Sequence, residues 1–182
     1  MTVEQIIVLA SEGFDATTDA IIALAQRTLA EHGAAGYKGI NKAIKKLKRD
    51  LNDCKDNQDL SANKAKFTEV QARIEAMYPG AGRLRNRPGA LMLIFMRVAV
   101  YYHVVYLLAQ GVKTGTVRPD VLVDNITALK AYNLVLDRSA AELFPDAEYL
   151  VKPLMEKVDA ILSLIQSPVA TGDSGYPDFS AN

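Results

Sequence analysis

The chain has 182 residues, and 49% of them are hydrophobic. A chain of this length fits one domain, which buries roughly 70% of the surface that is exposed in the unfolded state. Lysine plus arginine and aspartate plus glutamate both number 21, so no net charge attracts the protein to nucleic acid or to an anionic bilayer. Any such partner must bind a local basic patch.

The single cysteine and the first residues bear on where the protein resides. Cys54 alone excludes an internal disulfide framework and fits a reducing compartment. The first residues, MTVEQIIVLASEG, contain no basic segment and place Glu4 before any long apolar run, unlike a secretory signal. We therefore expect a cytoplasmic protein, or one that belongs to a particle assembled in the cytoplasm.

The spacing of apolar residues predicts the fold class. Apolar residues recur every three or four positions along most of the chain, and no stretch alternates with period two for long enough to indicate a sheet. We predict an all-α fold, a bundle of six or seven helices around a central apolar helix at about 90–110. The helices form one domain, 1–166, and an extended or flexible tail follows at 167–182.

The N-terminal half is predicted to contain four helices. The first ends near Gly13, the second begins between 15 and 19 and ends at His32, and the third covers about 39–53. A polar connector at 52–63 precedes the fourth helix. The following side chains are predicted to face inward: Ile40, Ile44, Leu47 and Leu51 in the third helix, and Phe67, Val70, Ile74 and Met77 in the fourth.

The C-terminal half begins with a loop at 78–89 that is rich in proline and glycine. The fifth helix is the apolar run that follows, and Gly111 is predicted to end it. The sixth helix begins at Pro119, a favourable first helical residue, and its apolar seam has one polar member, Asn133. The seventh helix is expected to be kinked or restarted at Pro153.

The apolar run at 90–110 has two explanations. It is long enough to span a bilayer, but its aliphatic residues and phenylalanine favour insertion by only ~3 to 6 kcal/mol, whereas Arg97 alone opposes insertion by about 2.5 to 3.5 kcal/mol. A central helix of a soluble bundle explains the run better. In that position Arg97 and His103 are expected to be buried, and an acidic group is expected to reach Arg97.

Polar residues of this helix form a candidate core site. They are Arg97, Tyr102, His103 and Tyr106. Arg97 and His103 are six residues apart and so project from different faces, and a satisfied core histidine is the simpler explanation of His103. With only one other histidine in the chain, we expect no metal and no cofactor. A small-molecule or pigment binder with its site in the bundle core is nevertheless one alternative function.

A resemblance bears on that alternative. The segment YYHVVYLLAQG, 101–111, resembles the long central helix of the phycobilisome pigment proteins, which are all-α and globin-like. Those proteins hold a bilin through a cysteine in this helix, and the segment here contains no cysteine. The resemblance therefore assigns neither a family nor a pigment to this chain.

Two basic segments are candidate nucleic-acid-binding sites, because phosphate binding requires only a local cluster of lysine and arginine. The first contributes Lys38, Lys42, Lys45, Lys46, Lys48 and Arg49, and the second contributes Arg83, Arg85 and Arg87. A solvated helix face is the simpler explanation of the first segment. No aromatic residues interleave with the cations to support base stacking.

The sequence contains no phosphate-binding loop and no CxxC, HExxH, GxSxG or EF-hand pattern, so we expect no enzymatic activity. Our first hypothesis is a structural subunit that assembles with copies of itself or with other subunits. In this assembly Tyr176, Pro177 and Phe179 of the tail dock in a groove. The alternative is a coat protein or nucleoprotein that packages nucleic acid, and a membrane partner is not expected.

Overall fold

The structure, a computed structural model, describes residues 2–32, 40–83 and 87–166, with the backbone alone at 29–32, 40, 41, 56 and 83. This part of the chain forms six α-helices and two short 3-10 helices, and it contains no β-strand. The prediction of an all-α fold is confirmed. The helices are α1 (Val3–His32), α2 (Ile40–Asp56), α3 (Leu60–Met77), α4 (Arg87–Lys113), α5 (Pro119–Leu143) and α6 (Glu148–Gln166), with η2 (Ala81–Arg83) and η3 (Pro145–Ala147).

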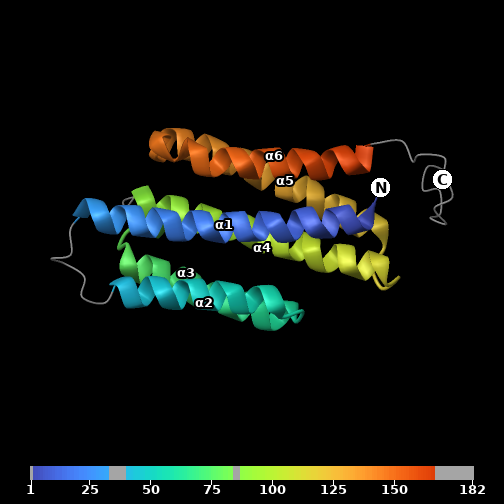
Figure 1. The fold of residues 1–182 in the computed structure, drawn as a ribbon, viewed down its shortest axis with the longest axis horizontal. Helices are drawn as coiled ribbons and strands as arrows, with labels where there is room; N and C mark the ends of the chain where they lie inside the picture. Colours follow the sequence, from blue (N-terminus) through green and yellow to red (C-terminus); the bar gives the residue numbers. More distant parts are fainter. Residues whose placement is uncertain (1, 33–39, 84–86, 167–182) are drawn as a thin grey trace.

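The helices lie side by side in three pairs (Figure 1). The long helices α1 and α4 make the most extensive contact with each other. Helices α5 and α6 pack together on one side of this pair, and the α2–α3 hairpin packs on the other side (Figure 1). Helix α4 contacts α1, α3 and α5, whereas α6 packs mainly against α1 and α5.

The prediction that a helix ends near Gly13 is wrong, because α1 continues through this residue to His32. Gly13 lies against the ring of Tyr102 in α4, and a β-carbon on Gly13 would lie 2.2 Å from Tyr102 Cε1. The glycine is therefore explained by the close approach of two helices rather than by a helix end. For this reason the first two predicted helices are one helix.

The polar connector is also shorter than predicted, since α2 extends to Asp56 and α3 begins at Leu60. Asp59 caps α3, and its carboxylate accepts hydrogen bonds from the backbone N–H groups of Ser61 and Ala62. The predicted inward residues of both helices are buried wherever their side chains are described: Ile44, Leu47, Leu51, Phe67, Val70, Ile74 and Met77.

Two further helix ends differ from the predictions. Helix α4 passes Gly111 and ends at Lys113, and the chain then folds back so that the N–H groups of Thr116 and Val117 donate to the Gly111 carbonyl. Helix α6 is continuous from Glu148 to Gln166 and includes the exposed Pro153, so the helix does not restart there, and a kink at Pro153 stays a prediction. The predicted start of α5 at Pro119 is confirmed, and its seam is buried together with Asn133.

Helix α4 is the one described helix that is long and apolar enough to cross a membrane, and half of its most apolar window is buried inside the protein. A core helix of a soluble protein passes the same test of length and hydropathy. The tail at 167–182, with Tyr176, Pro177 and Phe179, lies outside the described residues, as do Lys38 and Arg85.

Candidate functional site

The basic face of α2, as we call it, consists of exposed side chains on the solvent side of that helix. They are Lys42, Lys45, Lys46, Lys48 and Arg49. The opposite side of α2 buries Ile44, Leu47, Leu51 and Cys54 against the rest of the protein, and this burial fixes which way the cations point. The hydrophobic pattern of α2 therefore positions the basic face.

This face is electrostatically unfavourable in the isolated protein. Lys42 and Lys46, like Lys45 and Arg49, are four residues apart, a spacing at which like charges destabilise a helix by roughly 0.2–0.5 kcal/mol per pair. The cations also occupy the N-terminal two thirds of α2, whose first turn contains no acidic residue. The helix dipole disfavours positive charge at that end.

Acidic groups within the described residues do not neutralise the basic face. Asp50 of α2 is buried and pairs instead with α3, where Arg73 Nη1 lies 2.7 Å and Lys66 Nζ 3.9 Å from its carboxylate oxygens. No ion pair joins any of the five cations to another residue of the described part. The face therefore presents uncompensated positive charge to solvent.

The second predicted basic segment is only partly described. Arg87 is exposed at the first residue of α4, and Arg83 belongs to η2, where only the backbone is described. The predicted cluster of Arg83, Arg85 and Arg87 therefore contributes one described cationic side chain, at the start of α4.

His103 lies where the α2–α3 hairpin meets α4. Its Nε2 atom is 2.6 Å from the amide nitrogen of Asn63. The two hydrogens of this amide are shared among Nε2 and the carbonyl oxygens of Asn57, at 2.6 Å, and Cys54, at 3.2 Å. The two carbonyls lie at the C-terminus of α2, where helix carbonyls lack partners within the helix. Asn63 therefore satisfies the end of one helix and holds the histidine of another.

Burial lowers the pKa of His103, and a hydrogen bond to the backbone of Asn57 partly offsets this effect. The ring is therefore neutral near pH 7. It packs among Phe14, Phe67 and Tyr106, whose ring centroids lie 5.6 to 6.2 Å from its own. These contacts are those of a satisfied core histidine.

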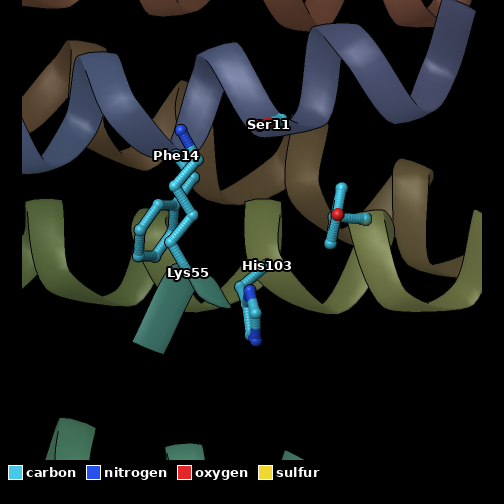
Figure 2. A pocket seen from close by; sticks show the side chains of 5 residues that line it. Ser11, Phe14, Lys55 and His103 are labelled. Carbon is cyan, nitrogen blue, oxygen red and sulfur yellow. The ribbon is translucent and has the colours of Figure 1, made fainter. Parts of the chain in front are cut away.

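A small pocket adjoins His103 (Figure 2). It is lined by Ser11, Phe14, Lys55, His103 and Tyr106. The volume open to the centre of a water molecule is about 10 Å³, which is room for one water. Lys55 Nζ pairs with an Asp15 carboxylate oxygen at 2.6 Å, so the one cation of the pocket is already neutralised.

The candidate core site of Arg97, Tyr102, His103 and Tyr106 is not assembled. The prediction that Arg97 is buried is wrong, because its side chain is exposed. Tyr102 is fully buried on another side of α4, and its hydroxyl donates to the Leu154 carbonyl at 3.0 Å. Only His103 and Tyr106 share a pocket.

Arg97 belongs instead to what we call the open stripe of α4. The stripe consists of Ile94, Arg97, Tyr101, Val104 and Leu108, at alternating spacings of three and four. Arg97 is exposed and the other four are half-buried. The Tyr101 ring stacks on Tyr132 of α5 with centroids 4.3 Å apart, and a hydrogen bond with Tyr132 raises the pKa of Tyr101.

No acidic side chain of the described residues forms an ion pair with Arg97. The described residues likewise contain no group of three or more His, Cys, Asp and Glu side chains that could hold a metal ion. Cys54 is buried, and burial raises the pKa of its thiol to about 11, which disfavours the reactive thiolate.

The chain matches no model of a known protein family, and no curated protein and no solved structure is detectably similar to it. The resemblance to phycobilisome proteins is therefore confined to the segment at 101–111.

Sequence reasoning missed two features of these sites. Asn63 fell in a segment predicted to be a polar connector, so its contact with His103 was not foreseen. The sequence contains one indication of the open stripe, which is the three- and four-residue spacing of Ile94, Arg97, Tyr101, Val104 and Leu108. The signal is weak because nearly every residue of this helix is apolar.

Proposed function

We propose that this protein is a non-enzymatic structural subunit of the cytoplasm, which assembles with copies of itself or with other subunits through the faces of its helices. In this proposal α4 is the central helix of the bundle, and its open stripe is the main assembly surface. The observation that carries the proposal is a stripe of half-buried apolar side chains around the exposed Arg97 on α4.

The open stripe differs from scattered surface apolar residues. Ile94 and Leu108 are fourteen residues apart, so the stripe extends for about 21 Å along α4. Contiguous apolar surface of this kind marks an interaction site more often than isolated exposed residues do. The large apolar residues that are fully exposed in the described part of the chain lie on other helices: Val8 on α1, Leu134 and Val135 on α5, and Tyr149 on α6.

A substitution on the stripe tests this proposal. Val104→Asp places a charge among the apolar positions and should weaken self-association by about tenfold or more in sedimentation velocity. Ala131→Asp, on the exposed side of α5, is the matched control and should leave association unchanged. If both variants associate as the original chain does, the open stripe is not an assembly surface.

The second candidate function is packaging of nucleic acid, which the basic face of α2 specifically favours. A phosphate backbone would supply the negative charge that the described residues do not provide. The positive end of the helix dipole would then favour the phosphates as well. Lysines that point to solvent from a rigid helix are suited to binding the backbone without reading the base sequence.

Binding of single-stranded RNA at several salt concentrations tests this second candidate. Lys45→Gln with Arg49→Gln should reduce affinity and make the slope of log K against log salt shallower by about 1.4. Lys152→Gln on α6 is the control for loss of an exposed lysine and should not change the slope. Absence of RNA binding by the original chain at low salt would eliminate packaging and leave assembly.

A small-molecule or pigment binder is the third candidate and has the least support. The pocket beside His103 holds about one water molecule, and the side chains around it are already partnered. A pigment or ligand released when the purified protein is denatured would revive this candidate.

A further inference from the structure

We propose that the open stripe of α4 is the docking site for the C-terminal segment, 167–182, of a neighbouring copy of this chain, and that Asp178 of that segment pairs with Arg97. The inference rests on the proposed assembly function and deepens it, because it names the segment that occupies the surface. It is carried by the chemistry of the stripe, by the composition of the segment, and by the position of the helix from which the segment departs.

The stripe requires an occupant with apolar side chains and a negative charge. Four of its five residues are apolar or aromatic and half-buried, and the fifth, Arg97, is exposed in their midst. No described residue forms an ion pair with Arg97. A second stripe packed against this one would bring two arginines together, so two stripes are poorly matched to each other.

The C-terminal segment has the complementary composition. It contains Tyr176, Pro177 and Phe179 as apolar anchors and two acidic residues, Asp173 and Asp178, and it contains no Lys, Arg or His. Asp178 lies between two of the anchors. A peptide bound through Tyr176 and Phe179 therefore carries a carboxylate to the middle of the contact.

The spacing of the anchors also suits a helix surface. In a peptide with the polyproline II conformation, residues three apart lie on the same side and about 9 Å from each other. Two turns of an α-helix rise about 10.5 Å, which is the separation of Ile94 and Tyr101, on either side of Arg97 along α4. The two aromatic rings of the segment can thus contact apolar positions on either side of one arginine-containing turn.

The position of α6 explains why the segment comes from a neighbouring copy. Gly13 and Phe14 of α1 contact Tyr102 and His103 of α4, and at 100° per residue the stripe lies about half a turn from these contacts. Helix α6 packs against α1 and α5. Because α6 packs against α1 and α5 and not against the stripe, we infer that the segment leaving α6 binds the stripe of a second copy rather than that of its own chain.

The C-terminus of α6, from which the segment continues, also lies at a suitable place for this contact. The C-terminus of α6 lies at the same end of the molecule as the C-terminus of α4 and the N-terminus of α1 (Figure 1). The ion pair between Lys113 Nζ and the Glu4 carboxylate at 3.9 Å confirms that the last two ends are adjacent. Ten residues separate Gln166 from Tyr176 and span up to ~33 Å, enough to reach along a neighbouring α4. Repetition of this contact from copy to copy is heterologous and builds a ring or a filament.

Charge exchange in the 182-residue chain tests the pairing. Arg97→Glu and Asp178→Lys should each weaken self-association by about tenfold in sedimentation velocity, and the double variant should restore it. Asp173→Lys makes the same change of charge five residues away and should have a small effect. The pairing would be overturned if Asp173→Lys and Asp178→Lys weakened self-association equally, or if the double variant did not restore it.

Photo-crosslinking identifies the copy that supplies the segment. A benzoylphenylalanine in place of Phe179, in a mixture of ¹⁴N- and ¹⁵N-labelled chains, should give crosslinks to α4 peptides of the other isotope. Crosslinks only within one isotope would show docking on the same chain and would overturn the inference.

The outcomes separate this inference from the proposed function. If the original chain associates and Asp178→Lys associates equally well, assembly holds but another surface occupies the stripe. If the original chain is monomeric at all concentrations, both the assembly and the docking are wrong. If it binds neutral phosphatidylcholine vesicles and Val104→Asp does not, the stripe contacts lipid and the segment is not its occupant.

Discussion

At the scale of single residues, the chain uses polar and small side chains to join helices at specific points. Gly13 allows α1 to approach Tyr102, and Asn63 connects the end of α2 to His103. Sequence periodicity does not predict such contacts, because they depend on which residues of two distant helices lie opposite each other. These residues therefore supply the sharpest tests of the fold.

Gly13→Ala tests the contact between α1 and α4. Alanine normally stabilises a helix relative to glycine by roughly 0.5–1 kcal/mol. Here the added β-carbon would overlap the Tyr102 ring, so we expect the free energy of unfolding to fall by about 1–3 kcal/mol. Ser11→Ala on the same helix is the control in urea denaturation. An increase in stability for Gly13→Ala would mean that the two helices are not in close contact.

His103 should make stability depend on pH. Because burial lowers its folded-state pKa below the ordinary value of 6.5, the unfolded chain binds this proton more readily. The contribution of the neutral His103 ring to the free energy of unfolding is complete above pH 6.5. It is lost as the pH falls below that value, with a slope of at most about 1.4 kcal/mol per pH unit. The difference in urea midpoint between the original chain and His103→Gln should therefore change between pH 7 and pH 5. A constant difference would contradict a buried neutral ring.

Asn133 is a buried polar residue whose side-chain oxygen has no partner among the described residues. Its amide nitrogen donates to the Leu129 carbonyl within α5. An unpaired buried acceptor costs about 1–3 kcal/mol, so Asn133→Leu should raise the free energy of unfolding by about 1–2 kcal/mol. The control is Asn125→Leu, because Asn125 makes the equivalent bond at a half-buried position. The Asn133 side chain also forms a hydrogen bond with the buried Tyr102. A loss of stability specific to Asn133→Leu would mean that this hydrogen bond contributes more than the unpaired oxygen costs.

At the scale of helices, the buried faces could be predicted from the sequence, whereas several helix ends could not. The apolar stripes of α2, α3 and α5 were predicted because each helix buries one side, which leaves a clear three- and four-residue pattern. The sequence predicts helix ends at Gly13 and Gly111, yet α1 and α4 continue through them, and α6 does not restart at Pro153. Local propensity indicates where a helix is weak, whereas packing between helices decides whether it continues.

The candidate site was predictable to a similar degree. The cations of α2 were placed correctly, because the buried stripe of an amphipathic helix determines its exposed face. The burial of Arg97 was predicted incorrectly because α4 is apolar on every side, so its sequence does not reveal which side remains uncovered. That information depends on how the neighbouring helices pack.

Lys42→Glu tests the electrostatics of the basic face. It puts a negative charge near the N-terminus of α2 and removes like-charge pairs with Lys45 and Lys46, so stability should rise by about 0.5–1 kcal/mol. Binding of RNA should weaken in the same variant. The stability gain should shrink in about 1 M salt, which screens surface charges, and a gain that persists there would mean that charge is not its cause.

At the scale of the whole molecule, the pairing of α1 with α4 forms a long core that α5, α6 and the α2–α3 hairpin cover unevenly (Figure 1). The uncovered parts are an apolar stripe with one arginine and a basic helix face. A monomer gains no stability from either feature, since one leaves apolar surface in water and the other concentrates like charges. The proposed partners would cover both surfaces.

Light scattering coupled to size-exclusion chromatography, without detergent and with absorbance at 260 and 280 nm, tests the central claim most directly. We predict a particle with a mass that is a multiple of the 19.8 kDa chain. Excess absorbance at 260 nm across the same peak would add packaged nucleic acid to the assembly. A homogeneous species of 19.8 kDa at every concentration would contradict the assignment as an assembly subunit.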